Sequence, residues 1–397
     1  MIEINETPPP EIEAFGRRAL IVGVIALVIT AIGAVMNLDQ FFRSWLLGYI
    51  FWIGITLGCF AILMLQHMSG GAWGLVIRRL LEGATRTLPL LALLFIPIIV
   101  GIKPLYLWAR PDTAPSEEVR TMLEHKHLYL NIGFFLIRAV IYFAIWMAIT
   151  YFLNKWSLEQ DRTGYRPITR RMQVLSGPGL VLYGLTVTFA SVDWVMSLRP
   201  EWFSTIYGIL FMGGQGLSAM AFVIAVIVLL SNYKPLSDIV QPRHLHDLGK
   251  LMLAFLMLWA YFAFSQFLII WSGNIPEEVT WYTQRIYSPW HWFGLALILV
   301  HFALPFLLLL SRDLKRNAWT LARVAILIII MRFIDLIWMT GPEFHEGAFT
   351  LHWMDFVVPI GIGGIWLAYF AYQLKQRPLI PIGDPYLEDA LAHTSGH

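Results

Sequence analysis

Long apolar runs separated by short polar loops dominate this chain. An α-helix of roughly 20 apolar residues spans the hydrocarbon core of a bilayer, which is about 30 Å thick. Ten runs of about this length can be marked, at approximately residues 19–37, 45–66, 86–102, 128–153, 175–198, 203–231, 248–271, 289–311, 318–340 and 352–373. The pattern therefore predicts an all-α integral membrane protein with about ten transmembrane helices.

Composition agrees with this prediction. The 397 residues are 58% hydrophobic and 14% charged, whereas a soluble domain is roughly 25% charged. We expect a flexible N-terminal segment at residues 1–18, a ten-helix transmembrane domain at 19–373 and a C-terminal tail at 374–397. The leading sequence "MIEINETPPPEIEAFGRR" lacks the basic start and small-residue cleavage site of a signal peptide, so we expect it to be retained.

The distribution of basic residues predicts the orientation of the chain. Most of the Lys and Arg outside the apolar runs lie in the two terminal segments and in the loops after the second, fourth, sixth and eighth runs. With ten crossings, all of these segments fall on one side of the membrane. Because cytoplasmic loops carry an excess of Lys and Arg, we expect both termini in the cytoplasm. The net charge of +2 then gives no indication of nucleic-acid binding.

The cysteine content limits the cofactors that the chain itself can hold. Cys59 is the single cysteine, which excludes an intrachain disulfide, a four-cysteine iron–sulfur site and covalent c-type haem attachment. His291 and His301 lie in one predicted helix, but ten residues at 100° each direct them about 80° apart. We therefore expect no haem and no metal site in this chain.

Two opposite charges, Arg332 and Asp335, lie within the apolar run 318–340. Each would cost roughly 2.5–3.5 kcal/mol at the middle of a membrane if it were unpaired. Because they are three residues apart, they share one helix face. Two interpretations remain open: a structural ion pair, or a pair beside a polar cavity through which protons move.

Other ionisable residues extend this pattern towards both sides of the membrane. Several have simpler interpretations: Asp193 could cap a helix or pair with Arg199, Asp355 could cap a helix, and His127 could be a solvated interfacial residue. The residues His67, Asp247 and Lys250 flank cytoplasmic helix ends, where charge costs little. The candidate proton-pathway residues are Asp335, Arg332, His301, Arg138, Asp193, Asp355, His67, Asp247 and Lys250.

Several long segments carry a family resemblance. They include "HKHLYLNIGFFLIRAVIY", "SVDWVMSLRPEWFSTIYG", "HDLGKLMLAFLMLWAYFAFSQFLIIWSGNIPEE", "HFALPFLLLLSRDLKRN" and "LHWMDFVVPIGIGGIW". These segments resemble the ActF subunits of alternative complex III, within the polysulfide reductase NrfD-like family of integral membrane proteins. The resemblance extends over the second to the tenth apolar run.

The resemblance implies two four-helix bundles plus two further helices, in the bacterial inner membrane. It also implies partners: the sister subunit ActC, an iron–sulfur subunit and c-type cytochrome subunits. Such a complex oxidises menaquinol, with iron–sulfur clusters and haem c in the partner subunits, and this subunit would not be catalytic alone. Relatives bind quinol near the outer face, where His127 and Asp193 become candidate quinol-binding residues. Because the likeness is to ActF rather than to the quinol-binding ActC, occupation of that site stays open.

Two other classes of function remain open from the sequence. An independent secondary transporter would also show ten helices, polar residues at mid-membrane and an inverted repeat, for which residues 125–143 and 244–262 give a weak match. A structural membrane anchor for redox subunits would need no proton path. Co-purification with haem and iron–sulfur chains would argue against the transporter.

Overall fold

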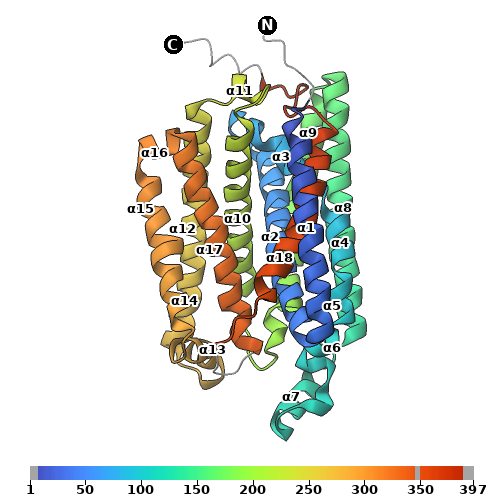
Figure 1. The fold of residues 1–397 in the computed structure, drawn as a ribbon, viewed down its shortest axis with the longest axis vertical. Helices are drawn as coiled ribbons and strands as arrows, with labels where there is room; N and C mark the ends of the chain where they lie inside the picture. The colour runs from blue at the N-terminus through green and yellow to red at the C-terminus, as the bar shows by residue number, and fades with distance from the viewer. Residues whose placement is uncertain (1–7, 345–348, 388–397) are drawn as a thin grey trace.

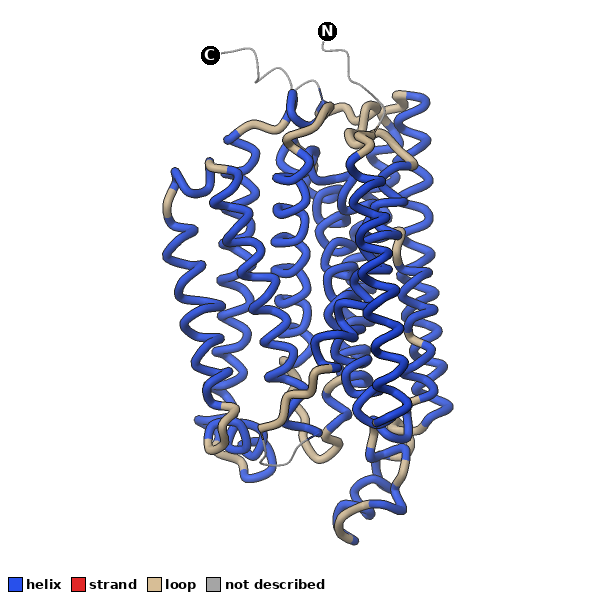
Figure 2. The backbone as a smooth tube through the Cα atoms, viewed as in Figure 1, coloured by secondary structure: helices blue, strands red, loops and turns tan. Residues whose placement is uncertain are grey.

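The computed structural model describes residues 8–344 and 349–387, and every regular element within these ranges is helical (Figures 1 and 2). Eight long helices form the body of the structure: α1 (Glu11–Met36), α2 (Leu38–Ser69), α8 (Ile132–Thr163), α9 (Pro167–Trp194), α10 (Tyr207–Leu230), α12 (Pro242–Gly273), α17 (Ala318–Phe344) and α18 (Met354–Lys375).

Two further crossings are built from shorter helices. The first consists of α3 (Leu75–Thr85), α4 (Leu88–Leu94), α5 (Ile96–Val100) and α6 (Ile102–Leu105); the second consists of α14 (His291–Ala296), η5 (Leu297–Ala303) and α15 (Leu304–Leu310). The connections hold η1 (Ala72–Gly74), η2 (Leu107–Ala109), η3 (Pro111–Thr113), α7 (Glu117–Lys126), η4 (Met196–Leu198), α11 (Leu236–Ile239), α13 (Pro276–Ile286) and α16 (Arg312–Arg316).

Nine helical stretches within the described residues are long and apolar enough to cross a membrane. They correspond to nine of the ten predicted runs. The remaining run, 318–340, lies within α17, a continuous helix of 27 residues that stands beside α10 and α12 (Figure 1). The structure is therefore that of a multi-pass membrane protein.

Prolines explain why the third crossing is not one helix. Pro89, Pro97 and Pro104 each lie in a separate short helix of this crossing. A proline has no backbone N–H and its ring clashes with the carbonyl four residues earlier, so it interrupts the helix before it. The candidate span begins at Leu75, whereas the sequence pattern placed the run at 86–102. The pattern missed the first part because α3 carries charged residues that lower its hydropathy.

The crossing that contains His301 has a different irregularity. Residues Leu297–Ala303 form η5, a π-helical segment, and Pro305 follows directly in α15. In an α-helix the N–H of residue 305 would bond to the carbonyl of His301, but proline cannot supply that donor. Short π segments relieve such a mismatch by admitting an extra residue in the turn.

Helices α2 and α10 form the centre of the bundle and contact each other closely. In each of these two helices, 89% of an apolar stretch of 18 residues is buried inside the protein, against 22% for the corresponding stretch of α1. Helix α1 covers α18 on the outside, and a Cβ on Gly364 would lie 2.4 Å from the Cα of Gly23. Glycine at these two positions therefore allows the two backbones to touch.

Both ends of the described chain lie at the same end of the bundle, where Lys375 pairs with Glu13 at 2.6 Å (Figure 1). Two sequence-based boundaries need correction. Helix α1 begins at Glu11, so residues 11–18 are helical rather than part of a flexible segment. The tail also packs on the bundle after α18, since Asp384 is buried against Arg78. Residues 1–7 and 388–397 of the predicted terminal segments lie outside the described residues.

Candidate functional site

The pair Arg332 and Asp335 lies near the middle of α17, with both side chains buried. Asp335 accepts a hydrogen bond from Arg332 Nη1 on the same helix face, as the three-residue spacing predicts. The indole Nε1 of Trp259, on α12, donates to the same carboxylate oxygen at 3.2 Å. The ion pair therefore links two neighbouring helices of the bundle.

Gly214 on α10 makes room for the Arg332 guanidinium. A Cβ added to Gly214 would lie 2.4 Å from the Cζ atom of Arg332 and 2.5 Å from Nη2. These distances are too short for a methyl group beside a planar guanidinium. The α10 backbone and the arginine are consequently in direct contact at this level.

His301 lies next to this pair and is fully buried, with 0% exposure. Its ring packs edge-to-face on Trp259, with 4.1 Å between the ring centroids. Within the part of the chain that the structure describes, neither ring nitrogen of His301 has a hydrogen-bond partner, and neither does Arg332 Nε. Buried polar atoms of this kind are normally satisfied by a protein group or by ordered water.

A second buried pair joins α8 to α9. Arg138 donates from Nε and Nη2 to the two carboxylate oxygens of Asp193, both at 2.8 Å, and the Tyr142 hydroxyl donates to Asp193 at 2.8 Å. The guanidinium also stacks over the rings of Tyr129 and Phe134 at 3.9 and 4.3 Å. All of these contacts hold the arginine in one position.

This arrangement corrects one alternative for Asp193. The sequence suggested that it caps a helix or pairs with Arg199, but Arg199 instead donates to Gln284. The two candidate quinol-binding residues differ in exposure: the His127 side chain is exposed at the end of α7, whereas Asp193 is buried against its partners on α8.

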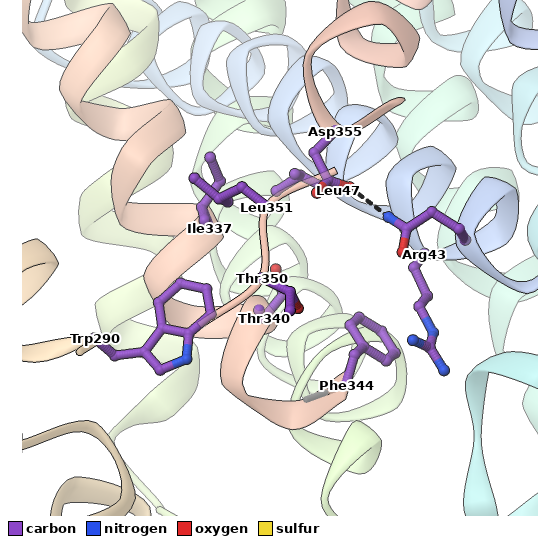
Figure 3. A pocket seen from close by; sticks show the side chains of 11 residues that line it. Arg43, Leu47, Trp290, Ile337, Thr340, Phe344, Thr350, Leu351 and Asp355 are labelled. Carbon is purple, nitrogen blue, oxygen red and sulfur yellow. Dashed lines mark hydrogen bonds between the residues drawn. The ribbon is translucent and has the colours of Figure 1, made fainter. Parts of the chain in front are cut away.

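Asp355 lies in the first turn of α18. Its Oδ1 atom accepts from Gln40 Nε2 at 2.9 Å and from Ser44 Oγ at 2.6 Å, and its Oδ2 atom accepts from the His352 N–H at 2.9 Å. Figure 3 shows Asp355 at the edge of a pocket that Arg43 also lines. The contact with the His352 N–H agrees with a capping role at the helix start.

The three residues predicted at the cytoplasmic helix ends differ in their surroundings. Asp247 and Lys250 form an exposed pair at 3.1 Å on the first turns of α12. His67 is buried near the end of α2. Of these three, only His67 therefore has an interior position.

An ionic cluster beside His67 was not predicted. Arg78 and Arg79 on α3 both contact Glu82, and they reach Asp384 and Asp161 on other segments. The sequence treated residues 78–82 as a loop. The sequence does contain an indication of this cluster. Glu82 follows Arg78 by four residues and Arg79 by three, and these spacings place paired charges on one helix face.

A further pair, Arg285 and Glu343, was also missed. Arg285 on α13 donates to Glu343 at 2.6 Å and stacks over Trp281 at 3.5 Å. Burial lowers the pKa of Arg285 below its ordinary value, and the Glu343 carboxylate raises it part of the way back. This pair lies beyond Asp335 on α17, towards the end of the bundle that carries α13 (Figure 1).

The predicted proton-pathway residues thus fall into five separate groups. These are the α17 pair with His301, the Arg138–Asp193 pair, Asp355 with its partners, His67 beside the α3 cluster, and the exposed Asp247–Lys250 pair. No group of three or more His, Cys, Asp or Glu side chains suited to a metal ion occurs among the described residues. Comparison with protein-family models and with curated proteins gave no match to this chain.

Proposed function

We propose that this chain is the integral membrane subunit of a quinol-oxidising electron-transfer complex, in which it carries protons rather than electrons. The proposal rests on the resemblance of its long segments to the ActF subunits of alternative complex III. Iron–sulfur and c-type cytochrome subunits would supply the redox centres, and menaquinol the electrons. The excess of Lys and Arg at the end that holds both termini supports a bacterial inner-membrane protein with both termini in the cytoplasm.

The helix contacts support a division into two four-helix bundles. The first would contain α2, the α3–α6 crossing, α8 and α9, and the second α10, α12, the α14–α15 crossing and α17. Helix α8 packs on α9, while α12 and α17 both pack on α10; α1 and α18 pair with each other. The α2–α10 contact would join the two bundles.

The observation that carries the proton role is the surroundings of His301. An imidazole and a carboxylate, His301 and Asp335, contact the same Trp259 indole in the middle of the bundle. Three buried nitrogens there, His301 Nδ1 and Nε2 and Arg332 Nε, have no partner within the described ranges. Water that satisfies these nitrogens would place a proton carrier between the imidazole and the carboxylate.

The test is the proton-to-electron ratio of the intact complex in proteoliposomes. Asp335→Asn should leave the complex assembled and quinol oxidation partly intact, because the amide fills the same space, but it should lower the number of protons released per electron. Asp112→Asn, an exposed acid in η3, is the matched control and should leave the ratio unchanged. A wild-type ratio in an assembled Asp335→Asn complex would overturn the proton role.

One observation favours a second candidate, a purely structural anchor for redox subunits. Arg332 and Asp335 contact each other directly on one helix, and a paired charge of this kind is stable without any transport. On this alternative Arg332→Met impairs assembly, because it leaves a buried carboxylate without its partner. The anchor role also predicts full proton release in every variant that assembles, which separates it from the proton role.

A further inference from the structure

A basic cavity lies at the end of the bundle that holds both termini, between the end of α3 and the end of α18. It is a shallow cavity that is open to the outside of the protein. Three arginines line it, Arg79, Arg86 and Arg377, together with one acid, Glu82. The wall of the cavity therefore carries an excess of positive charge.

The three arginines differ in how fully the protein satisfies them. Arg79 pairs with Glu82 and Asp161, and Arg377 lies 3.5 Å from Glu82. Arg86 has no acidic partner within 4.0 Å among the described residues; its one hydrogen bond is from Nη1 to the Gln373 carbonyl at 3.3 Å. The uncompensated charge of the cavity is consequently that of Arg86.

One buried donor in the same wall also lacks a partner in the described chain. It is Arg79 Nε, from a residue that is 3% exposed. Burial lowers the pKa of Arg377 below its ordinary value, with Glu82 raising it only in part. A bound anion would favour the charged form of Arg377 and would accept a hydrogen bond from Arg79 Nε.

The cavity borders a surface suited to lipid. Directly after Arg86, helices α4 and α5 present an exposed apolar strip that includes Leu93, Ile96 and Val100, at 63%, 51% and 69% exposure. Acyl chains can lie along such a strip while a headgroup reaches the arginines. Basic pockets between transmembrane helices recognise anionic headgroups in this way.

We propose that this cavity binds a phosphate group, held by Arg86 and Arg377 with Arg79 behind them. Guanidinium groups match the geometry of phosphate oxygens and stay charged when they are half-buried. The phosphate comes from an anionic phospholipid or from free phosphate, since both present the same oxygens. The site is independent of quinol oxidation and of proton transfer at Asp335.

Native mass spectrometry of the full chain, purified in detergent and depleted of lipid, tests the proposal. Separate samples receive cardiolipin, phosphatidylglycerol, phosphatidylcholine or inorganic phosphate. A lipid source predicts at least about tenfold tighter binding of the two anionic lipids than of phosphatidylcholine. A free-phosphate source predicts that inorganic phosphate binds and that the lipids do not differ. If the three lipids bind equally well to the wild-type chain and inorganic phosphate does not bind, the proposal is wrong.

Variants then assign the binding to this cavity. Arg86→Gln should weaken binding by about tenfold, because one charge-assisted contact is lost, and Arg86→Lys should recover part of it. Arg323→Gln is the matched control, an exposed arginine on α17 near the same end of the bundle. Loss of binding in the control, or full retention in a folded Arg86→Gln chain, shows that the phosphate binds elsewhere.

Discussion

Two of the buried arginine–aspartate pairs of this protein, Arg138–Asp193 and Arg332–Asp335, differ in how completely they are satisfied. Arg138 and Asp193 join two helices through two hydrogen bonds of 2.8 Å, with a tyrosine hydroxyl and two aromatic rings completing the site. Arg332 and Asp335 belong to one helix, and in the described structure Arg332 Nε has no partner. The unsatisfied His301 lies beside the second pair.

The comparison shows that a buried ion pair alone does not indicate transport. A fully satisfied pair holds its charges fixed, so a proton that arrives there finds no free acceptor. An incompletely satisfied pair needs an acceptor such as water to complete its hydrogen bonds. We therefore propose a stabilising role for the Arg138–Asp193 pair beside the proton role proposed above for the α17 site, and three substitutions test how the two pairs differ.

Arg138→Met should have the largest effect, because it leaves the Asp193 carboxylate buried without its counter-charge. We expect about 3–5 kcal/mol of destabilisation, measured as a lower thermal unfolding temperature of the detergent-solubilised chain or as loss of purifiable protein. The double variant Arg138→Met, Asp193→Leu should recover much of this stability, since both charges are then gone. Wild-type stability of the single variant would show that Asp193 can take a proton, contrary to our assignment.

Gly214→Ala should have an intermediate effect at the other pair. The added methyl group would lie 2.4 Å from Arg332 Cζ and should force the guanidinium away from Asp335, at a cost of about 1–3 kcal/mol. Gly184→Ala on α9 is the control, because nothing lies within 4 Å of its added Cβ. Thermal unfolding of both variants measures the difference. Equal stability would mean that Arg332 moves freely and is not held by Asp335.

Trp259→Phe should have the smallest effect. It removes the 3.2 Å hydrogen bond to Asp335 but keeps an aromatic ring against His301, so we expect about 1 kcal/mol. Trp146→Phe, which removes a 2.8 Å bond to Thr186 near the first pair, provides the comparison by the same unfolding measurement. A loss of several kcal/mol at Trp259 would indicate that this indole, rather than Arg332, holds the carboxylate in place.

Much of the fold follows from the sequence because helix length and hydropathy alone specify a membrane crossing. Nine of the predicted runs coincide with candidate spans of the structure. The α17 pair was also predictable, since residues three apart on a helix share a face. Arg138 and Asp193, however, are 55 residues apart, and only the packing of α8 against α9 brings them together.

The irregular parts of the structure were the least predictable from hydropathy. The α3 cluster lies in a helix whose Arg78, Arg79 and Glu82 interrupt the apolar pattern, although the cluster is buried. Its partners Asp161 and Asp384 come from the end of α8 and from the tail. The hydropathy of one segment does not tell which charged residue, far away in the sequence, will pair with the charges of that segment.

The π-helical segment η5 has a consequence for sequence length. A π turn holds about one residue more than an α turn. The residues after η5 are therefore shifted by one sequence position from where an uninterrupted α-helix would place them. Deleting one residue from Leu297–Ala303 would restore an α-helical turn with both flanking parts in their present orientation, and only side chains within the turn would change position. The side chain that faces Trp259 is therefore selected by the count of residues in this turn as well as by their identities.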